Sequence, residues 1–245
     1  MSVLECDNIT VTMDGVKIIE NVSLHLEKGE IVSLLGVSGS GKTTLFNVLS
    51  GLYTPEEGKV LLDGEDITAK PGQISYMLQK DLLLPHYTVI DNVALPLVIK
   101  GMNKKQARQK AQPFFDVFGL GGCEKKYPSQ LSGGMKQRAA LMRTYLSSKG
   151  VALLDEPFSA LDTITKSAVH MWYLDVMKKI ELSTVFVTHD IDEAILLSDR
   201  VYIMSGKPGR ITDEIRIDMK KPRKNEDMLT DEFLTYKRMI VEKIR

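Results

Sequence analysis

The sequence predicts an α/β fold with a parallel sheet at its core and a block of helices inserted between two strands. Strands buried on both faces of a parallel sheet are near-continuous apolar runs, and in an α/β core each is followed by a helix. Three runs fit this pattern and precede segments with helical spacing: residues 31–35, 151–154 and 184–187. Between about Pro85 and Leu146 the strand patterns stop, and the apolar spacing predicts helices over 88–99, 103–118 and 133–147.

The flanking residues predict strands at the start of the chain and a helix at its end. Apolar and polar residues alternate over 22–27, as in a half-buried strand, and residues 3–11 and 59–62 predict two more strands. Asp14-Gly15 and Asp63-Gly64 are turn signals. Near the C-terminus, three- and four-residue apolar spacing predicts an amphipathic helix packed on its own domain, with these residues facing inward: Phe233, Tyr236, Ile240 and Ile244.

Composition excludes several classes of protein. The 245 residues include 32 Lys or Arg and 32 Asp or Glu, so the zero net charge argues against a nucleic-acid binder. We interpret the basic cluster Lys220–Lys224 as a solvated linker for the same reason. From the first residues we expect no secretion signal, and the longest uncharged stretch, Thr43–Pro55, is too short to span a membrane. The two cysteines are expected to be reduced thiols.

A phosphate-binding loop follows the apolar run 31–35 directly. The pattern G-x-x-x-x-G-K-T matches, in order, Gly36, Val37, Ser38, Gly39, Ser40, Gly41, Lys42 and Thr43, with Thr44 next in the loop. Glycines let the backbone wrap closely around a phosphate, and the following helix N-terminus offers N–H donors. Lys42 supplies a positive charge for the β- and γ-phosphates, and the Thr43 hydroxyl is a hard ligand for Mg²⁺. The sequence therefore predicts a P-loop nucleotide-binding core.

Two carboxylates end the apolar run 151–154. Asp155 and Glu156 would be delivered to the carboxyl edge of a parallel sheet, where open α/β sheets bind ligands. We expect Asp155 to hold the Mg²⁺ shell and Glu156 to polarise an attacking water. An apolar strand ending in acids is common, so this motif gains its weight from the phosphate loop.

Further motifs resemble those of the ABC-transporter ATPases. Residues 131–138, Leu-Ser-Gly-Gly-Met-Lys-Gln-Arg, resemble the signature motif of that family, and Ser159-Ala160-Leu161-Asp162 resembles its D-loop. Gln79 matches the family's Q-loop glutamine, and His189 matches its switch histidine. His25, His86 and His170 have no comparable motif and are interpreted as structural.

The resemblance implies a fold and a domain organisation. The family combines a RecA-like P-loop NTPase core with an N-terminal antiparallel β subdomain and an inserted helical subdomain. One ABC ATP-binding domain is thus expected over 1–245. Its core would span about 1–84 and 147–220, its helical subdomain about 85–146, and its C-terminal amphipathic helix about 227–245.

The resemblance also implies a mechanism. Such ATPases work as head-to-tail dimers, with ATP and Mg²⁺ between one subunit's phosphate loop and the other's signature motif. The trans contact would come from Ser132, Gly133, Gly134 and Gln137, and Asp162 would set the dimer interface. Catalysis would rest on Lys42, Glu156 and His189. Mg²⁺ would be held by Thr43, Gln79 and Asp155. The partner is expected to be a second copy or a paralogous ATPase.

One position departs from the family pattern. The family usually has an aromatic residue that stacks on adenine near the end of the first strand, and by spacing from Gly36 this position is Met13. A thioether packs on a π-face less specifically than a ring does. We therefore hypothesise that selectivity for ATP over GTP is lower than is usual, with Val16 adding apolar contact.

Two segments indicate an importer. Residues 82–97 resemble the segment after the Q-loop in bacterial importers, and Pro208-Gly209-Arg210-Ile211 resembles the C-terminal pattern of nitrate/sulfonate/taurine-type importers. The implied partners are membrane permease subunits and, indirectly, an extracytoplasmic solute-binding protein. This places the chain at the cytoplasmic face of the membrane. Alternatives are a soluble ABC ATPase of cluster assembly or repair, a non-hydrolysing regulator, or a subunit for another solute or an exporter.

Overall fold

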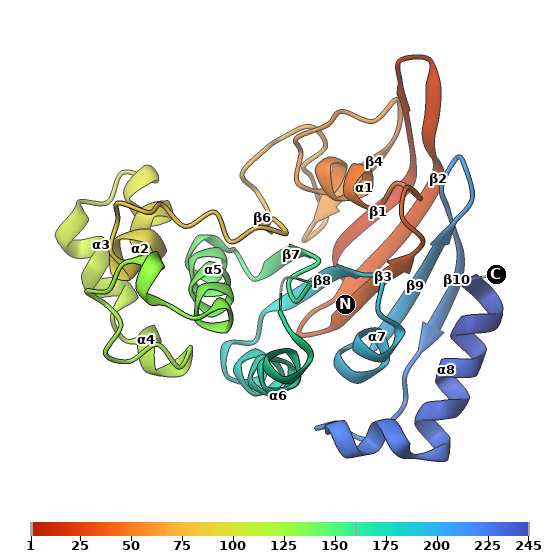
Figure 1. Ribbon diagram of the computed structural model, residues 1–245. Helices are drawn as coiled ribbons and strands as arrows, with labels where there is room; N and C mark the ends of the chain where they lie inside the picture. The colour runs from red at the N-terminus through yellow and green to blue at the C-terminus, as the bar shows by residue number, and fades with distance from the viewer. Residues whose placement is uncertain (1, 160, 245) are drawn as a thin grey trace.

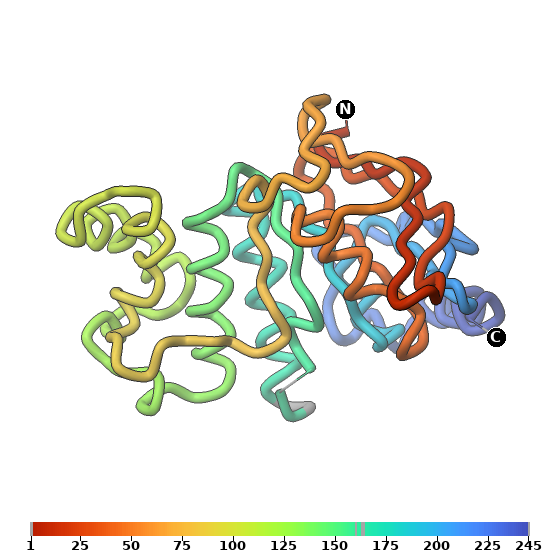
Figure 2. The backbone as a smooth tube through the Cα atoms, turned by 90° about the horizontal axis from the view of Figure 1, so that it is seen from above, coloured from red at the N-terminus to blue at the C-terminus, as the bar shows by residue number. Residues whose placement is uncertain are grey.

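The protein combines two β-sheets with helices on either side of the larger one (Figure 1). The computed structural model describes residues 2–159 and 161–244. Strands and helices occupy the predicted α/β order, and a group of helices lies at one end of the molecule, away from both sheets (Figures 1 and 2). Within the described residues, no helix is long and apolar enough to span a membrane.

The smaller sheet is antiparallel and contains the start of the chain. Its four strands have the order β2-β1-β4-β5. Asp14 adopts a positive φ of 50° in the tight turn that joins β1 to β2, in agreement with the predicted turn. The strands span Ser2–Met13 (β1), Val16–Glu27 (β2), Glu57–Leu62 (β4) and Glu65–Asp66 (β5).

The larger sheet has six strands in the order β10-β9-β3-β8-β7-β6. Its strands are parallel except for β10, which pairs antiparallel with β9 at one edge. Every residue of the central strands β3, β7 and β8 is buried, as the near-continuous apolar runs predicted. The strands span Ile31–Gly36 (β3), Ser75–Met77 (β6), Val151–Asp155 (β7), Ser183–Thr188 (β8), Arg200–Ser205 (β9) and Arg210–Arg216 (β10).

Alternate residues of the larger sheet face two different hydrophobic cores. Val32 and Leu34 of β3 pack with helix α1 (Lys42–Leu49) and the antiparallel sheet. Ile31 and Leu35 face the other side and pack against a second layer of helices. This layer contains α5 (Gly133–Ser147), α6 (Thr163–Ile180) and α7 (Ile191–Leu197). Since both faces are covered, only the ends of the parallel strands are open to a ligand.

The inserted helices occupy one end of the molecule (Figure 2). The helix predicted over 103–118 is wrong as a single element, because the chain forms two helices there, separated at Gln112-Pro113. Proline lacks an N–H and its ring clashes with the preceding turn, so Pro113 disfavours a continuous helix, although α2 (Val89–Ile99) accommodates Pro96 within its last turns. The other elements span Lys104–Ala111 (α3), Phe114–Val117 (α4) and Pro128–Gln130 (η1).

The C-terminal segment packs on its own chain. A short 3-10 helix, η2 (Asn225–Leu229), precedes α8 (Asp231–Ile244), whose buried residues Phe233 and Ile240 join the core around α7. The interpretation of Lys220–Lys224 as a solvated linker is wrong for Arg223, which is 1% exposed. Its guanidinium donates to the carbonyls of Ile195 and Ile217, both at 2.6 Å, because a buried charge needs partners.

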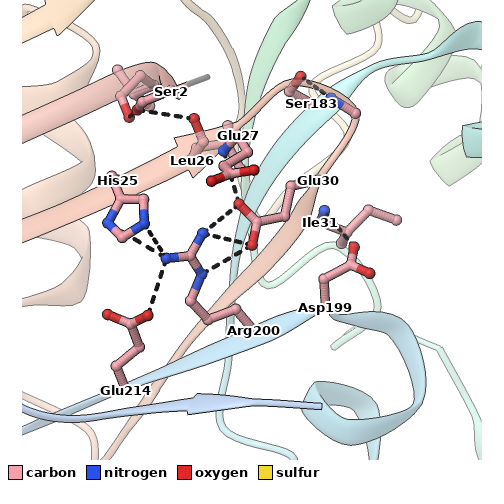
Figure 3. Close-up of polar contacts among 12 residues, drawn as sticks. Ser2, His25, Leu26, Glu27, Glu30, Ile31, Ser183, Asp199, Arg200 and Glu214 are labelled. Carbon is pink, nitrogen blue, oxygen red and sulfur yellow. Dashed lines mark hydrogen bonds and ion pairs between the residues drawn. The ribbon is translucent and has the colours of Figure 1, made fainter. Parts of the chain in front are cut away.

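A buried arginine connects the two sheets (Figure 3). Arg200 of β9 is 1% exposed and donates from Nη2 to both carboxylate oxygens of Glu30 at 2.7 Å. It also binds Glu214 of β10 at 3.0 Å and the ring of His25 on β2. His25 therefore has a structural role, as interpreted from the sequence.

Candidate nucleotide-binding and hydrolysis site

The phosphate loop runs from the end of β3 into the first turn of α1. Gly41 adopts a φ of 93°, a left-handed conformation that favours glycine. An added Cβ at Gly41 would lie 2.4 Å from the side chain of Ile19, and one at Gly36 would lie 2.2 Å from the carbonyl oxygen of Met204. Both positions therefore require glycine for the loop to keep its path and to direct N–H groups at an anion.

An open cavity of about 420 Å³ lies over this loop. Its lining comes from the phosphate loop and from the carboxyl ends of β7 and β8, with one residue from β2. Six of the nine predicted loop residues thus share one cavity with the predicted acids and histidine, whereas Gly36, Val37 and Ser40 are not among its described lining residues. The lining residues are Ile18, Ser38, Gly39, Gly41, Lys42, Thr43, Thr44, Asp155, Glu156, Val187 and His189.

Lys42 lies in the floor of the loop. It is 8% exposed, and its Nζ donates to the carbonyls of Gly36 and Val37, both at 2.8 Å. Burial lowers the pKa of Lys42, while the nearby charges of Glu156 and Asp155 oppose that change. These contacts hold the ammonium group beside the cavity, within the same loop that presents the backbone donors.

Asp155 is the last residue of β7 and is 8% exposed. Its Oδ2 accepts a hydrogen bond from the Tyr76 hydroxyl at 3.2 Å, and its carboxylate also pairs with the Thr43 hydroxyl. Burial raises the pKa of Asp155, and those two hydrogen bonds act in the opposite direction. The structure therefore places two hard oxygen ligands, one hydroxyl and one carboxylate, side by side.

This pair of donors fits Mg²⁺. Magnesium bound with phosphates needs only one or two protein carboxylates, because phosphate oxygens and waters complete its shell. Among the described residues, no group of three or more His, Cys, Asp or Glu forms a closed metal cage. An open pair at a phosphate loop is the arrangement expected for a metal that arrives with its nucleotide.

Gln79, Glu156 and His189 form a hydrogen-bonded chain at the cavity. The Gln79 amide donates to Oε2 of Glu156 at 2.8 Å, and Nδ1 of His189 lies 3.2 Å from Oε1 of the same carboxylate. Glu156 has a positive φ of 44°, a strained conformation for this residue type. Gln79 and His189, from widely separated segments, thus both contact the Glu156 carboxylate.

The signature segment lies elsewhere. The Ser132 side chain caps α5 by accepting from the N–H of Met135 at 3.3 Å, and both Ser132 and Gly133 are exposed. An added Cβ at Gly134 would lie 3.3 Å from Thr165 and Val169, so glycine permits close packing of α5 on α6. Gln137 is 6% exposed and faces the interior. Among the described lining residues of the cavity, none comes from this segment.

The D-loop begins the neighbouring helix. Asp162 caps α6, and its Oδ1 accepts from the N–H of Thr165 at 3.1 Å. Ser159 accepts a hydrogen bond from Gln79 at 3.3 Å, so this loop touches the glutamine–glutamate–histidine chain. Ala160 lies outside the described residues.

Met13 and Val16 pair across the β1–β2 turn. Val16 is 61% exposed, and Met13 is half-buried. Neither residue lines the cavity, whereas Ile18, two residues along β2 from Val16, does. The predicted base-contact residues therefore lie on the same strand pair as the cavity wall but beyond its edge.

Comparisons with known proteins identify the family. The family model described as "ABC transporter" matches residues 19–159, more than half of the chain. The chain belongs to the ABC transporter family. Its membership accounts for the phosphate loop, the signature segment and the acids at the end of β7 occurring in this order in one chain.

Several relatives within the ABC transporter family carry named functions. A formylaminopyrimidine import ATP-binding protein of Halalkalibacterium halodurans is 44% identical, covering 85% of this chain and 82% of the relative. An aliphatic sulfonates import ATP-binding protein of Bacillus cereus is 40% identical, covering 88% and 89%. A nitrate import ATP-binding protein of Synechocystis is 39% identical, covering 82% and 76%.

Solved ABC cassettes share the architecture. The dimeric post-hydrolysis structure of an ATP-binding cassette bound to ADP and Pi is 29% identical, with a TM-score of 0.73, covering 89% of this chain and all of that one. A cassette from Clostridium perfringens is 23% identical with a TM-score of 0.81, covering 99% and 97%. The latter likeness concerns the fold alone. The α/β prediction with an inserted helical block is confirmed.

Sequence reasoning missed three residues at the site. Tyr76 reaches Asp155 through its hydroxyl, and Ile18 and Val187 line the cavity. Val187 lies in the predicted strand 184–187, two residues before His189, so strand alternation could have placed it. No local pattern marks Tyr76, because its partner lies 79 positions away.

Proposed function

We propose that this chain is the ATP-hydrolysing subunit of a bacterial ABC importer for a small solute, such as a nitrate- or sulfonate-like anion or a related compound. The observation that carries the proposal is the hydrogen-bonded chain of Gln79, Glu156 and His189 beside the phosphate loop (the cradle, Gly36 to Thr44), where Glu156 and His189 line the cavity. A nucleotide-binding regulator without hydrolysis has no need for a strained carboxylate held by a histidine at this point.

The cradle would bind the phosphates of ATP. The loop from Gly36 to Thr44 offers backbone N–H groups and the N-terminus of α1, and Lys42 offers a buried positive charge. Thr43, Asp155 and Gln79 would hold Mg²⁺, which when bound neutralises phosphate charge. The adjacency of Thr43 and Asp155 supports the first two ligands. Gln79 donates a hydrogen bond to Glu156, the residue that follows Asp155.

Glu156 would orient or deprotonate the attacking water, and His189 would contact the γ-phosphate. Phosphoryl transfer depends on positioning and charge stabilisation more than on covalent chemistry, so fixed polar groups suffice. Glu156 is held from two sides, by Gln79 and by His189, which restricts its rotamer. A restricted carboxylate loses little freedom when it binds water, and this supports its role as the general base.

A second subunit would complete the site. Ser132, Gly133, Gly134 and Gln137 would serve a partner's nucleotide, and Asp162 would lie at the dimer interface. The exposed start of α5 supports this role for Ser132 and Gly133, and the dimeric related cassette supports the assembly. Gln137 has weaker support because its side chain is buried. The partner would be a second copy of this chain or a paralogue.

The importer assignment depends on the relatives, whose names specify import of formylaminopyrimidine, aliphatic sulfonates and nitrate. Those names favour it over soluble cluster-assembly or repair ATPases and over exporters. We infer that membrane permease subunits hold the chain at the cytoplasmic face, with an extracytoplasmic binding protein delivering the solute. Leu82 and Leu84 are 53% and 39% exposed beside Gln79 and offer apolar contacts to a permease, whereas Leu83 is buried.

We also propose the single-domain organisation predicted above, with the core at about 1–84 and 147–220, the helical subdomain at about 85–146 and the terminal helix at about 227–245. The two sheets, the helices around α2 and the packing of α8 on α7 are the features that support these boundaries.

Substitution of Glu156 tests the proposal. Glu156→Gln keeps the size and a hydrogen-bond acceptor but removes the base, so ATP binding should persist while turnover falls by about a thousandfold or more. The variant should accumulate as an ATP-dependent dimer in size-exclusion chromatography. Glu124→Gln in the helical block is a matched control and should keep wild-type turnover. Hydrolysis by Glu156→Gln at the wild-type rate would remove Glu156 from the mechanism.

A further inference from the structure

A cluster of charged side chains lies behind the loop that carries His189. Lys166 of α6 makes ion pairs with Asp190 at 2.9 Å and with Glu193 of α7 at 2.5 Å. His170, one turn further along α6, places Nε2 3.3 Å from Glu193. None of these four residues belongs to the motifs that the proposed mechanism uses.

The cluster fixes both neighbours of His189. The Thr188 hydroxyl donates to Oε2 of Glu193 at 2.6 Å, and the N–H of Asp190 donates to Thr188 Oγ1 at 3.0 Å. Oδ1 of Asp190 caps α7 by accepting from the N–H groups of Asp192 at 2.9 Å and Glu193 at 3.2 Å. These hydrogen bonds hold the backbone on both sides of His189. The His189 side chain is 63% exposed, and its ring lies beside Glu156.

The pairs lie where charge interactions are strong. The side chain of Glu193 is 5% exposed and that of Lys166 is 21% exposed. Burial raises the pKa of Glu193, but the approach of His170, the ion pair with Lys166 and the hydrogen bond from Thr188 outweigh it and lower the pKa overall. Burial likewise lowers the pKa of Lys166, yet its two carboxylates raise it overall. Lys166 thus compensates the carboxylates of Asp190 and Glu193, and its loss leaves those two carboxylates without their cation.

Lys166 also links this loop to the D-loop. Its backbone N–H donates to the carbonyl of Asp162 at 2.8 Å, which places it in the first turn of α6. A displacement of the start of α6 is therefore transmitted to Asp190 and Glu193 through one side chain. Helix α6 lies between the predicted dimer contact at Asp162 and the histidine loop.

We propose that Lys166 is a positioning residue that couples the start of α6 to His189, so that the D-loop sets the placement of the histidine against Glu156. The inference rests on the role proposed above for His189. It assigns to Lys166 no contact with nucleotide. The expected consequence of losing Lys166 is slower turnover without loss of nucleotide binding.

The test replaces the charge and keeps the aliphatic stem. Lys166→Met should lower kcat by about tenfold or more, because small misplacements at a catalytic centre have effects of this size. The affinity for ATP should stay within about twofold of wild type, since Lys166 lies outside the cradle. Lys179→Met is the matched control, because Lys179 pairs with Asp175 on the exposed face of the same helix at 2.6 Å. It should leave both quantities unchanged.

A spectroscopic readout separates positioning from general destabilisation. The chain has four histidines, so their ring Cε1–H signals can be assigned by single substitutions in NMR. In Lys166→Met the His189 signal should shift or broaden, while the His25 and His86 signals stay in place. Lys166→Arg should restore both the signal and kcat, since it restores the cation.

Two outcomes would overturn the proposal: an unchanged His189 signal with unchanged kcat in Lys166→Met, or changes of equal size in Lys179→Met. If Lys166→Met does not fold, Asp190→Asn keeps the helix cap but weakens the ion pair, and the same readouts apply. The proposed function fails separately, if His189→Ala retains wild-type turnover. A defect in His189→Ala together with a silent Lys166→Met would overturn the coupling alone.

Discussion

The phosphate loop and the signature segment both lead into helix N-termini, but the Asp155 and Glu156 carboxylates lie beside the start of α1 and not beside the described start of α5. At the start of α1, Lys42 lies beside Asp155 and Glu156 in a shared cavity. At the start of α5, Ser132 and Gly133 are exposed and Lys136 follows them; neither helix has an acidic residue in its own first turn, so the acids beside α1 come from the end of β7. The comparison shows that this chain places acids beside the N-terminus of α1 and leaves the N-terminus of α5 exposed.

The difference follows from the positions of the two helices on the sheet. Helix α1 follows β3, whose carboxyl end lies beside those of β7 and β8, so residues after all three strands converge. Helix α5 follows the inserted helices and packs along α6. We therefore expect a site that uses both helices to need two chains.

The largest expected effect comes from removing the charge of the cradle. Lys42→Ala should lower ATP hydrolysis by about a thousandfold and weaken nucleotide binding, because no other cation lies in the described lining of the cavity. ATPase assays and binding of a fluorescent nucleotide analogue would measure both effects. Wild-type turnover in this variant would contradict the cradle assignment.

Ser132→Arg should break the other half of the comparison. A bulky cation at the exposed start of α5 should abolish ATP-dependent dimerisation and turnover while each monomer still binds nucleotide at wild-type affinity. Mixing Lys42→Ala with Ser132→Arg subunits should partly restore turnover, because one site of the mixed dimer is then intact in both halves. Restoration would be absent if each chain carried a complete site.

A smaller effect is expected from Tyr76→Phe. Hydrogen bonds to charged groups contribute about 1.5–3 kcal/mol. Loss of the hydroxyl that holds Asp155 should therefore raise the Mg²⁺ concentration needed for half-maximal nucleotide binding by about tenfold. Phenylalanine keeps the edge contact with Phe46, which lies 5.8 Å away between ring centroids. Titrating Mg²⁺ at fixed nucleotide concentration measures the change, and binding without metal should be unaltered.

The smallest effect concerns the base. Because Met13 replaces the usual ring, we expect the wild-type preference for ATP over GTP to be below about a hundredfold. Met13→Tyr should raise the affinity for ATP by several-fold, in line with about 0.5–1.5 kcal/mol for an aromatic contact. Comparing ATP and GTP hydrolysis by both proteins tests this. A wild-type preference above about a hundredfold would contradict the hypothesis.

Continuous patterns made much of the fold predictable. The buried strands β3, β7 and β8 are single apolar runs, and the phosphate loop is one unbroken motif after β3, so local rules sufficed. Pro113, which lies between α3 and α4, is also visible in the sequence, but the apolar spacing over 103–118 continues across it. By contrast, the buried state of Arg223 depends on carbonyls up to 28 positions away, which no local rule contains.

By itself, the sequence determined the α/β class, the phosphate loop and the order of the motifs, because each depends on neighbouring residues and on strand or helix periodicity. Only the tertiary structure decided that Gln79, Glu156 and His189 meet at one carboxylate, that Tyr76 supports Asp155, and that Lys166 connects α6 to the histidine loop. Those contacts join residues 24 to 79 positions apart, so they exist only once the strands are paired and the helices are packed on the sheet.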